Sequence, residues 1–284
     1  MMEPGLVGRK RWNRLMFGLT ALCTGIALAT LFAILGYIAW RGVSCVGWVF
    51  LTHLPAPVGE PGGGIANAIV GSAKLVALAS VLGIPVGVLG GVYLAEYGDN
   101  LTGAVIRYAA DLLNGVPSIV MGIFAYALIV LPMRHFSALA GSAALAVIMV
   151  PLVLRNTEEF VRLVPRSVRE AGLALGVTRW KVILRIVLPT AAKGILTGAL
   201  LAVSRVAGET APVLFTAFGN RFWDNGWNNP IAALPLIIYT YAISPYEDWH
   251  RQAWAAAFVL LAVVLVANLG ARVLLRAPQQ GGGT

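Results

Sequence analysis

Two oppositely charged residues lie within an otherwise apolar stretch of the chain, residues 194–218. Arg205 and Glu209, in the segment SRVAGETAP, are four residues apart, so on a continuous helix they share one face. A charge at the centre of a membrane helix costs roughly 2.5–3.5 kcal/mol, so neither side chain should face lipid. Two interpretations stay open: an internal salt bridge that only fixes packing, or a pathway site in which the guanidinium binds an oxyanion.

A second polar segment begins another apolar stretch, LNGVPSIV at residues 113–120. Glycine and proline there loosen a helix and expose backbone groups, which either line a cavity or merely kink the helix. We take Asn114 and Ser118 as candidate pathway residues on the first interpretation. Lys74 lies about eight residues from the outer end of its own apolar stretch. It either snorkels outwards or provides a second pathway cation.

The polar stretch SVREAGLALGVTRWKVILRIVLP, residues 167–189, contains signals for two short helices. Ser167 and Glu170 have the spacing of a capping box at the start of the first helix. Gly176 is placed to end that helix with a positive φ. Thr178 can then cap the second helix. These signals predict a helix, a glycine turn and a second helix within one loop.

Pro189 ends this stretch and predicts a break or kink where the next apolar stretch begins. Considered alone, the two short helices fit an amphipathic element lying on anionic lipid. The other interpretation is a docking element for a partner protein.

The composition indicates that these elements sit in a membrane. Of 284 residues, 58% are hydrophobic and 12% are charged, whereas soluble domains carry about 25% charge. The net charge of +9 comes from cations that flank apolar runs, which indicates membrane topology rather than nucleic-acid binding. The two cysteines and three histidines show no metal-ligand or disulfide spacing. We expect no metal, no cofactor and no nucleic-acid partner.

Six apolar runs have about the ~20 residues that a membrane-spanning helix needs. In lipid only helices satisfy the backbone of such runs, so we expect an all-α integral membrane protein with six transmembrane helices. A shorter run, 231–243, should be interfacial or re-entrant. The six runs are 15–40, 67–94, 112–131, 138–154, 194–218 and 253–275.

The distribution of lysine and arginine predicts the orientation. With the N-terminus inside, fifteen of the 21 Lys and Arg residues fall in inside segments and four in outside segments. Positive residues concentrate on the cytoplasmic side, so both termini should be cytoplasmic. We expect three parts: an N-terminal helix with a periplasmic loop (1–66), a core (67–275) whose longest cytoplasmic loop is 155–190, and a flexible tail (276–284).

The stretch 167–189 also resembles the EAA loop of ABC import permeases. The pattern Glu-Ala-x, three residues, Gly, nine residues, Ile-x-Leu-Pro is matched, except that Gly172 stands where the family usually has alanine. The resemblance implies that this loop couples to a cytoplasmic ATPase. The coupling residues that it implies are Glu170, Ala171, Gly172, Gly176, Ile186, Leu188 and Pro189.

Further strings resemble the PstA-type permeases of phosphate ABC importers, namely GGGIANAIVGS, GVYLAEYG, LNGVPSIVMGIFAY and GETAP. This resemblance covers most of residues 62–254. It implies the type I ABC importer permease fold and phosphate uptake across a bacterial inner membrane. The candidate pathway residues remain those argued above from charge and helix-breaking residues, namely Arg205, Glu209, Asn114 and Ser118. The implied partners are a homologous second permease (PstC-type), a cytoplasmic ATPase dimer (PstB-type) and a periplasmic phosphate-binding protein (PstS-type).

Other functions stay open from the sequence. The chain has no G-x-x-x-x-G-K-[ST] motif, so we expect ATP hydrolysis to reside in a partner. A permease for another oxyanion, such as sulfate or molybdate, would share most of these features. A membrane sensor or scaffold would need the docking loop without Arg205 and Glu209. An ion-coupled transporter that works alone would not need the EAA loop.

Overall fold

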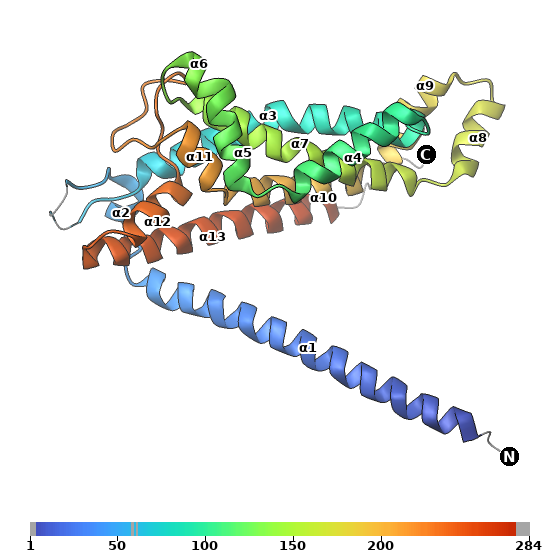
Figure 1. Cartoon of the computed structure of the whole chain (residues 1–284), viewed down its shortest axis with the longest axis horizontal. Helices are drawn as coiled ribbons and strands as arrows, with labels where there is room; N and C mark the ends of the chain where they lie inside the picture. Colours follow the sequence, from blue (N-terminus) through green and yellow to red (C-terminus); the bar gives the residue numbers. More distant parts are fainter. Residues whose placement is uncertain (1–3, 58–59, 61, 277–284) are drawn as a thin grey trace, which may run out of the picture.

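The structure, a computed structural model, describes residues 4–57, 60 and 62–276. Within these residues the chain is helical, and its long helices run roughly side by side (Figure 1). Five helical segments are long and apolar enough to cross a membrane. They are α1 (Pro4–Val43), α3 (Ala66–Tyr97), α7 (Ala138–Arg162), α10 (Leu188–Ala207) with the helical turns that precede it from Arg179, and α13 (Glu247–Arg276).

The sixth span is sharply bent. Helix α4 (Leu101–Gly115) and the helical segment Ser118–Met133 together have the length and composition of a span, but they meet at an angle of 105°. Val116 lies at the corner with extended backbone, ψ 132°, as expected for a residue that precedes a proline. The bend falls within the predicted run 112–131, at the Gly and Pro that were expected to loosen or kink this helix, and counting the bent pair as one span gives six spans. Its second arm consists of α5 (Ser118–Ala125), η1 (Tyr126–Val130) and α6 (Leu131–Met133).

Short helices lie at both ends of the bundle (Figure 1). We call these the α8 end and the α12 end, after one helix at each. At the α8 end lie α8 (Arg166–Ala174), α9 (Arg179–Val182) and η2 (Ile183–Val187). Toward the α12 end lie α2 (Trp48–Thr52), α11 (Ala211–Thr216) and α12 (Leu234–Ala242).

Helices α3 and α7 pack closely because small residues line their contact. A Cβ atom on Gly87 would lie 2.7 Å from Val153 Cβ, and one on Gly91 would lie 2.5 Å from Leu154 O. Such small residues let membrane helices approach closely enough for many van der Waals contacts. This pair forms the rigid centre of the bundle, around which α4, α5 and α10 are arranged.

Helix α1 contacts the rest of the described chain only near its C-terminal end. There Tyr37 stacks edge-on against Trp254 with ring centroids 5.2 Å apart. Towards its N-terminus the helix diverges from the bundle (Figure 1), and apolar side chains such as Phe17 and Phe32 are exposed. A helix of this composition needs lipid or another membrane helix along that length.

Several helices extend beyond the predicted apolar runs. Helix α7 ends at Arg162 rather than at residue 154, and α13 begins at Glu247 rather than at residue 253. Hydropathy marks only the part of a helix that lies in lipid, whereas polar turns can continue it into water. The predicted loop 155–190 therefore begins later, at residue 163. Of the predicted tail, residues 277–284 lie outside the described residues.

Candidate functional site

The loop at the α8 end has the predicted helix–turn–helix form, with a different start. Helix α8 begins at Arg166 after Pro165, so Ser167 is already inside the helix and the predicted capping box with Glu170 is wrong. Proline shortly before a helix fixes its first turn without a side-chain cap. The glycine turn is confirmed, because Gly176 has φ +77°. Thr178 precedes α9 as predicted, but its side chain makes no cap hydrogen bond.

The two short helices pack against each other through Gly172. Its α-carbon is buried, and an added Cβ would lie 3.0 Å from Val182 Cγ2 and 3.1 Å from Ile186 Cδ1. The glycine at this position therefore brings α8 close to α9 and η2. This contact gives a physical reason for the one departure of the loop from the EAA pattern.

Large apolar side chains on this loop point away from the described chain. Leu175 is 84% exposed and Trp180 is 56% exposed, and Leu173 and Leu184 are also exposed. Glu170 and Ala171 are exposed beside them. We call Leu173, Leu175, Trp180 and Leu184 the loop face. A cluster of exposed apolar side chains with polar neighbours marks a surface that binds another protein or the membrane.

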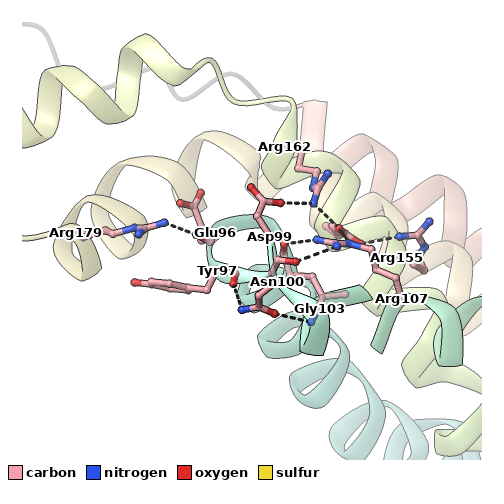
Figure 2. A network of polar contacts seen from close by, with 12 residues as sticks. Glu96, Tyr97, Asp99, Asn100, Gly103, Arg107, Arg155, Arg162 and Arg179 are labelled. Carbon is pink, nitrogen blue, oxygen red and sulfur yellow. Dashed lines mark hydrogen bonds and ion pairs between the residues drawn. The ribbon is translucent and has the colours of Figure 1, made fainter. Parts of the chain in front are cut away.

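Two arginines tether the loop to the ends of α3 and α7, and Figure 2 shows one of them, Arg179, beside Glu96. Arg169 donates to Glu96 Oε1 at 2.8 Å and to Val161 O at 2.8 Å. Arg179 donates to the backbone oxygen of Glu96, and its guanidinium lies 4.5 Å from the Tyr97 ring centroid. A movement of the loop must therefore pull on both α3 and α7.

A buried carboxylate forms the centre of the neighbouring network. The Glu158 side chain is 3% exposed, and it binds Arg107 at 2.6 Å, Arg155 at 2.8 Å and Arg162 at 3.0 Å. Arg107 comes from α4, so the network joins α4 to α7. Arg107 also donates hydrogen bonds to backbone oxygens at the end of α3. We call Glu158 and these three arginines the Glu158 hub. The hub was missed in the sequence, where only the spacing of Arg155, Glu158 and Arg162 on one helix face pointed to it.

The chain continues through Pro189 instead of breaking there. Residues Arg179–Ala207 form one helical segment of 29 residues, and η2 widens the helix immediately before the proline. A π-type turn of this kind accommodates a proline because the local hydrogen-bond pattern is already shifted. Of the predicted break or kink at Pro189, the break is therefore wrong, and the loop is joined to α10 by continuous helix.

The helix instead breaks at the second charged residue of the apolar stretch. Helix α10 ends at Ala207, and α11 begins at Ala211 with Pro212 in its first turn. Glu209 therefore lies in the break, and the prediction that it shares a helix face with Arg205 is wrong. Among the described residues neither side chain forms an ion pair. Arg205 is exposed and Glu209 is half-buried.

Two helix breaks occur in segments that pack together. Helix α11, which follows the break at Glu209, packs against α5, which follows the bend at Pro117. The contact is close, because a Cβ on Gly122 would lie 3.0 Å from Pro212 Cα. Asn114 precedes the bend and Ser118 follows it, and both are half-buried. Non-helical backbone at membrane depth is tolerated where it is buried in protein or lines a cavity.

Lys74 finds a partner at the α12 end. Its Nζ lies 2.8 Å from Asp224 Oδ1 and 2.7 Å from Asp224 Oδ2. Asp224 belongs to the loop between α11 and α12 and is 12% exposed. The lysine therefore holds this loop against α3, which accounts for a cation within an apolar helix.

Together these features favour binding and movement over bond chemistry. Within the described residues, no group of three or more His, Cys, Asp and Glu is placed to hold a metal. The loop face is an exposed apolar surface, and the loop is linked to α3, α7 and α10. Arg205 is an exposed cation near the end of α10, about one helical turn before the break at Glu209.

Known proteins resemble this chain over most of its length. The family model described as "Binding-protein-dependent transport system inner membrane component" matches residues 83–279. A protein of Yersinia pestis named phosphate transport system permease protein PstA is 43% identical, over 94% of this chain and 90% of its own. A protein of the same name from Xylella fastidiosa (strain 9a5c) is 47% identical, over 83% of this chain and 82% of its own.

Solved structures show the same fold. A chain of a bacterial alginate ABC transporter superposes with a TM-score of 0.66 at 13% identity, covering 96% of this chain and 98% of its own. A chain of the MetNI methionine ABC transporter gives a TM-score of 0.62 at 17% identity, over 75% and 96%. These likenesses confirm the predicted type I ABC importer permease fold.

Proposed function

The chain belongs to the family of binding-protein-dependent transport system inner membrane components, and from this membership we propose that it is the pore subunit of an ATP-driven phosphate importer. The observation that carries the proposal is the similarity to the PstA permeases, which extends over nearly the whole chain. The loop at the α8 end and the broken helix with Arg205 are the features that such a subunit needs. No observation favours sulfate, molybdate or a sensor role.

We infer that the loop face docks on a cytoplasmic ATPase. The exposed side chains of Leu175 and Trp180 supply apolar area of the kind found at the centre of protein interfaces. The rigid connection from the loop into α10 carries any displacement towards Arg205. Glu170, Ala171, Gly172, Gly176, Ile186, Leu188 and Pro189 thus keep the coupling role that the EAA resemblance implied.

The remaining partners follow from the proposed importer. A second, homologous permease of the PstC type would complete the pore, and a PstS-type binding protein would deliver phosphate at the α12 end. The diverging, apolar helix α1 has exposed area for the second permease or for lipid. An ATPase dimer of the PstB type would bind below both permeases.

We propose that the α8 end lies in the cytoplasm. The start of α1 and the end of α13 both lie towards that end (Figure 1), so both termini would be cytoplasmic, in agreement with the lysine and arginine distribution. Single cysteines at Arg166 and Gly226 test this with a membrane-impermeant reagent on intact cells. Labelling at 226 and protection at 166 is expected, and the reverse pattern would invert the topology.

We propose Arg205 and Glu209 as polar groups of the anion path, with Asn114 and Ser118 at the neighbouring bend. The alternative, a structural salt bridge, has lost support because the two side chains do not pair in the described structure. Arg205 is exposed in the isolated chain, as expected for a side chain that faces the second permease across a pore. A planar guanidinium binds a phosphate oxyanion through paired hydrogen bonds.

Replacing Arg205 separates the two roles. Arg205→Gln should leave assembly with the second permease and ATPase intact and should lower phosphate uptake at least tenfold. A structural pair would behave differently: Arg205→Gln would destabilise the complex, and Arg205→Gln with Glu209→Gln would restore both assembly and uptake. A fully transporting double variant would remove both residues from the path.

Complementation in cells tests the substrate. The chain, expressed with its three partners in a bacterium that lacks its own phosphate importers, should restore uptake of radiolabelled phosphate. The same genes should fail to restore sulfate uptake in a strain that lacks its sulfate importers. Sulfate or molybdate uptake without phosphate uptake would replace the proposed substrate and leave the importer architecture standing.

A further inference from the structure

A small pocket opens beside α11 and α12, at the opposite end of the bundle from the coupling loop. Its volume is about 220 Å³, several times the ~30 Å³ that one water molecule occupies in the liquid. Leu214 contributes to its wall from α11, and Leu236 and Ile237 contribute from α12. The pocket therefore adjoins the short helix that follows the break at Glu209.

Arg221 is the one charged residue among those that line this pocket. Within the described residues its guanidinium has no carboxylate partner and makes no hydrogen bond. Its carbon Cζ lies 5.2 Å from the ring centroid of Trp249, and this cation–π contact holds the side chain over α13. All five N–H groups of the Arg221 guanidinium are thus available to a ligand.

Tyr241 gives the pocket a hydroxyl donor on a largely buried ring. The residue is only 4% exposed, and its ring stacks on Trp249 with centroids 4.6 Å apart. Its hydroxyl makes no hydrogen bond to any described residue and is not among the enclosed polar atoms, so it is accessible from the pocket. Burial raises the pKa of the Tyr241 phenol, and the nearby Arg221 charge opposes that rise. At neutral pH the hydroxyl therefore carries its proton and can donate it to an acceptor.

The rest of the lining favours an anion. Thr240 adds a second hydroxyl, which is exposed and has no hydrogen-bond partner in the described part of the chain. No carboxylate lines this pocket, whereas a pocket of about 410 Å³ at the α8 end is lined by Glu96, Asp99 and Glu170 as well as by arginines. A cation with two neutral donors and apolar walls suits a small oxyanion, because nothing in the pocket repels negative charge.

We propose that Arg221, Thr240 and Tyr241 form a binding site for the transported oxyanion at the α12 end, upstream of the Arg205 region. The inference rests on the proposed function, which supplies the ligand, phosphate, and the side from which it arrives. The segment 208–216 connects the pocket to the Arg205 region, since it runs from the break at Glu209 through α11 to the pocket wall. Phosphate would then pass from Arg221 to Arg205 when α11 moves.

Charge chemistry at position 221 provides the first test. The complete complex carries Arg221→Cys, with Cys23→Ser and Cys45→Ser so that no other cysteine of this chain reacts. Uptake should fall at least tenfold and should recover several-fold after reaction with a methanethiosulfonate that adds an ammonium group, but not with one that adds a sulfonate. Inorganic phosphate at millimolar concentration should slow the modification. Equal uptake after both reagents would overturn the proposal.

The Tyr241 hydroxyl provides a second test with a matched control. Tyr241→Phe keeps the ring stacked on Trp249 and removes only the hydroxyl, so uptake should fall several-fold at low phosphate while assembly is unchanged. Tyr239→Phe, on the same helix but outside the pocket lining, should transport as the unsubstituted complex does. Equal uptake by the two variants would contradict a ligand role for Tyr241.

The outcomes separate this inference from the proposed function. If the unsubstituted complex takes up phosphate and the Arg221 and Tyr241 variants do too, only the pocket assignment is wrong. If the unsubstituted complex takes up no phosphate, the proposed function fails, and the assignment of phosphate to this pocket fails with it. If the variants weaken docking of the binding protein while phosphate no longer protects Arg221→Cys, the pocket is a protein-docking surface and the inference is wrong.

Discussion

Replacing Glu158 by glutamine should loosen the whole α8 end. The carboxylate is 3% exposed and binds Arg107, Arg155 and Arg162 at 2.6, 2.8 and 3.0 Å. Glutamine has nearly the same shape, but it removes the negative charge and turns one oxygen into a donor. That donor then faces guanidinium donors, and three arginines lose their shared counter-charge.

The size of this effect follows from the burial of the hub. Removing one partner of a buried ion pair costs about 3–5 kcal/mol. The lower end of that range applies here, because the three arginines are 22%, 31% and 47% exposed and Arg155 keeps Asp111 as a partner at 2.9 Å. For a domain of 150–250 residues, each kcal/mol lowers the midpoint of thermal unfolding by about 2–4 °C. Glu158→Gln should therefore lower the midpoint by roughly 10 °C, measured on the detergent-solubilised chain.

Asp99→Asn is the matched control. Asp99 also contacts Arg162, but at 3.6 Å and with a side chain that is 91% exposed, so its removal should change stability by at most about 0.5 kcal/mol. The midpoint of this variant should stay within about 2 °C of the unsubstituted chain. If Glu158→Gln also stayed within that range, the argument that the hub holds α4 on α7 would be refuted.

The loop at the α8 end yields two further predictions. Gly176→Ile should strain the turn, since Gly176 has φ +77° and β-branched residues resist that conformation; co-purification of the ATPase should fall severalfold, whereas Gly176→Asn should be tolerated. Trp180→Ala removes an exposed side chain of the loop face, so it should leave thermal stability unchanged and weaken ATPase binding about tenfold. Loss of stability without loss of ATPase binding would contradict the docking assignment.

The sequence predicted the spans and the loop because both depend on local signals. Long apolar runs identify membrane helices whatever their neighbours, and a glycine placed to end a short helix predicts its own backbone, as the φ of Gly176 shows. The capping box failed because Pro165 already fixes the start of α8. The predicted start of this helix, Val168, and the observed start, Arg166, are two residues apart. Residue propensities do not resolve a difference of that size.

The candidate site was harder to predict because it depends on helix breaks and on long-range contacts. The spacing of Arg205 and Glu209 implies a shared face only if the helix continues. Gly208, followed four residues later by Pro212, indicates a helix end and a new start, and that signal was available. The pairing of Arg107 with Glu158 joins residues 51 positions apart, so no local pattern contains it.

Uptake of radiolabelled phosphate by proteoliposomes tests the central claim most directly. The vesicles contain this chain, the second permease and the ATPase, with the loaded binding protein at the α12 side and ATP at the α8 side. We expect ATP-dependent phosphate accumulation, no sulfate accumulation, and at least a tenfold loss with Arg205→Gln in a fully assembled complex. Phosphate accumulation that persists without ATP or without this chain would contradict the account.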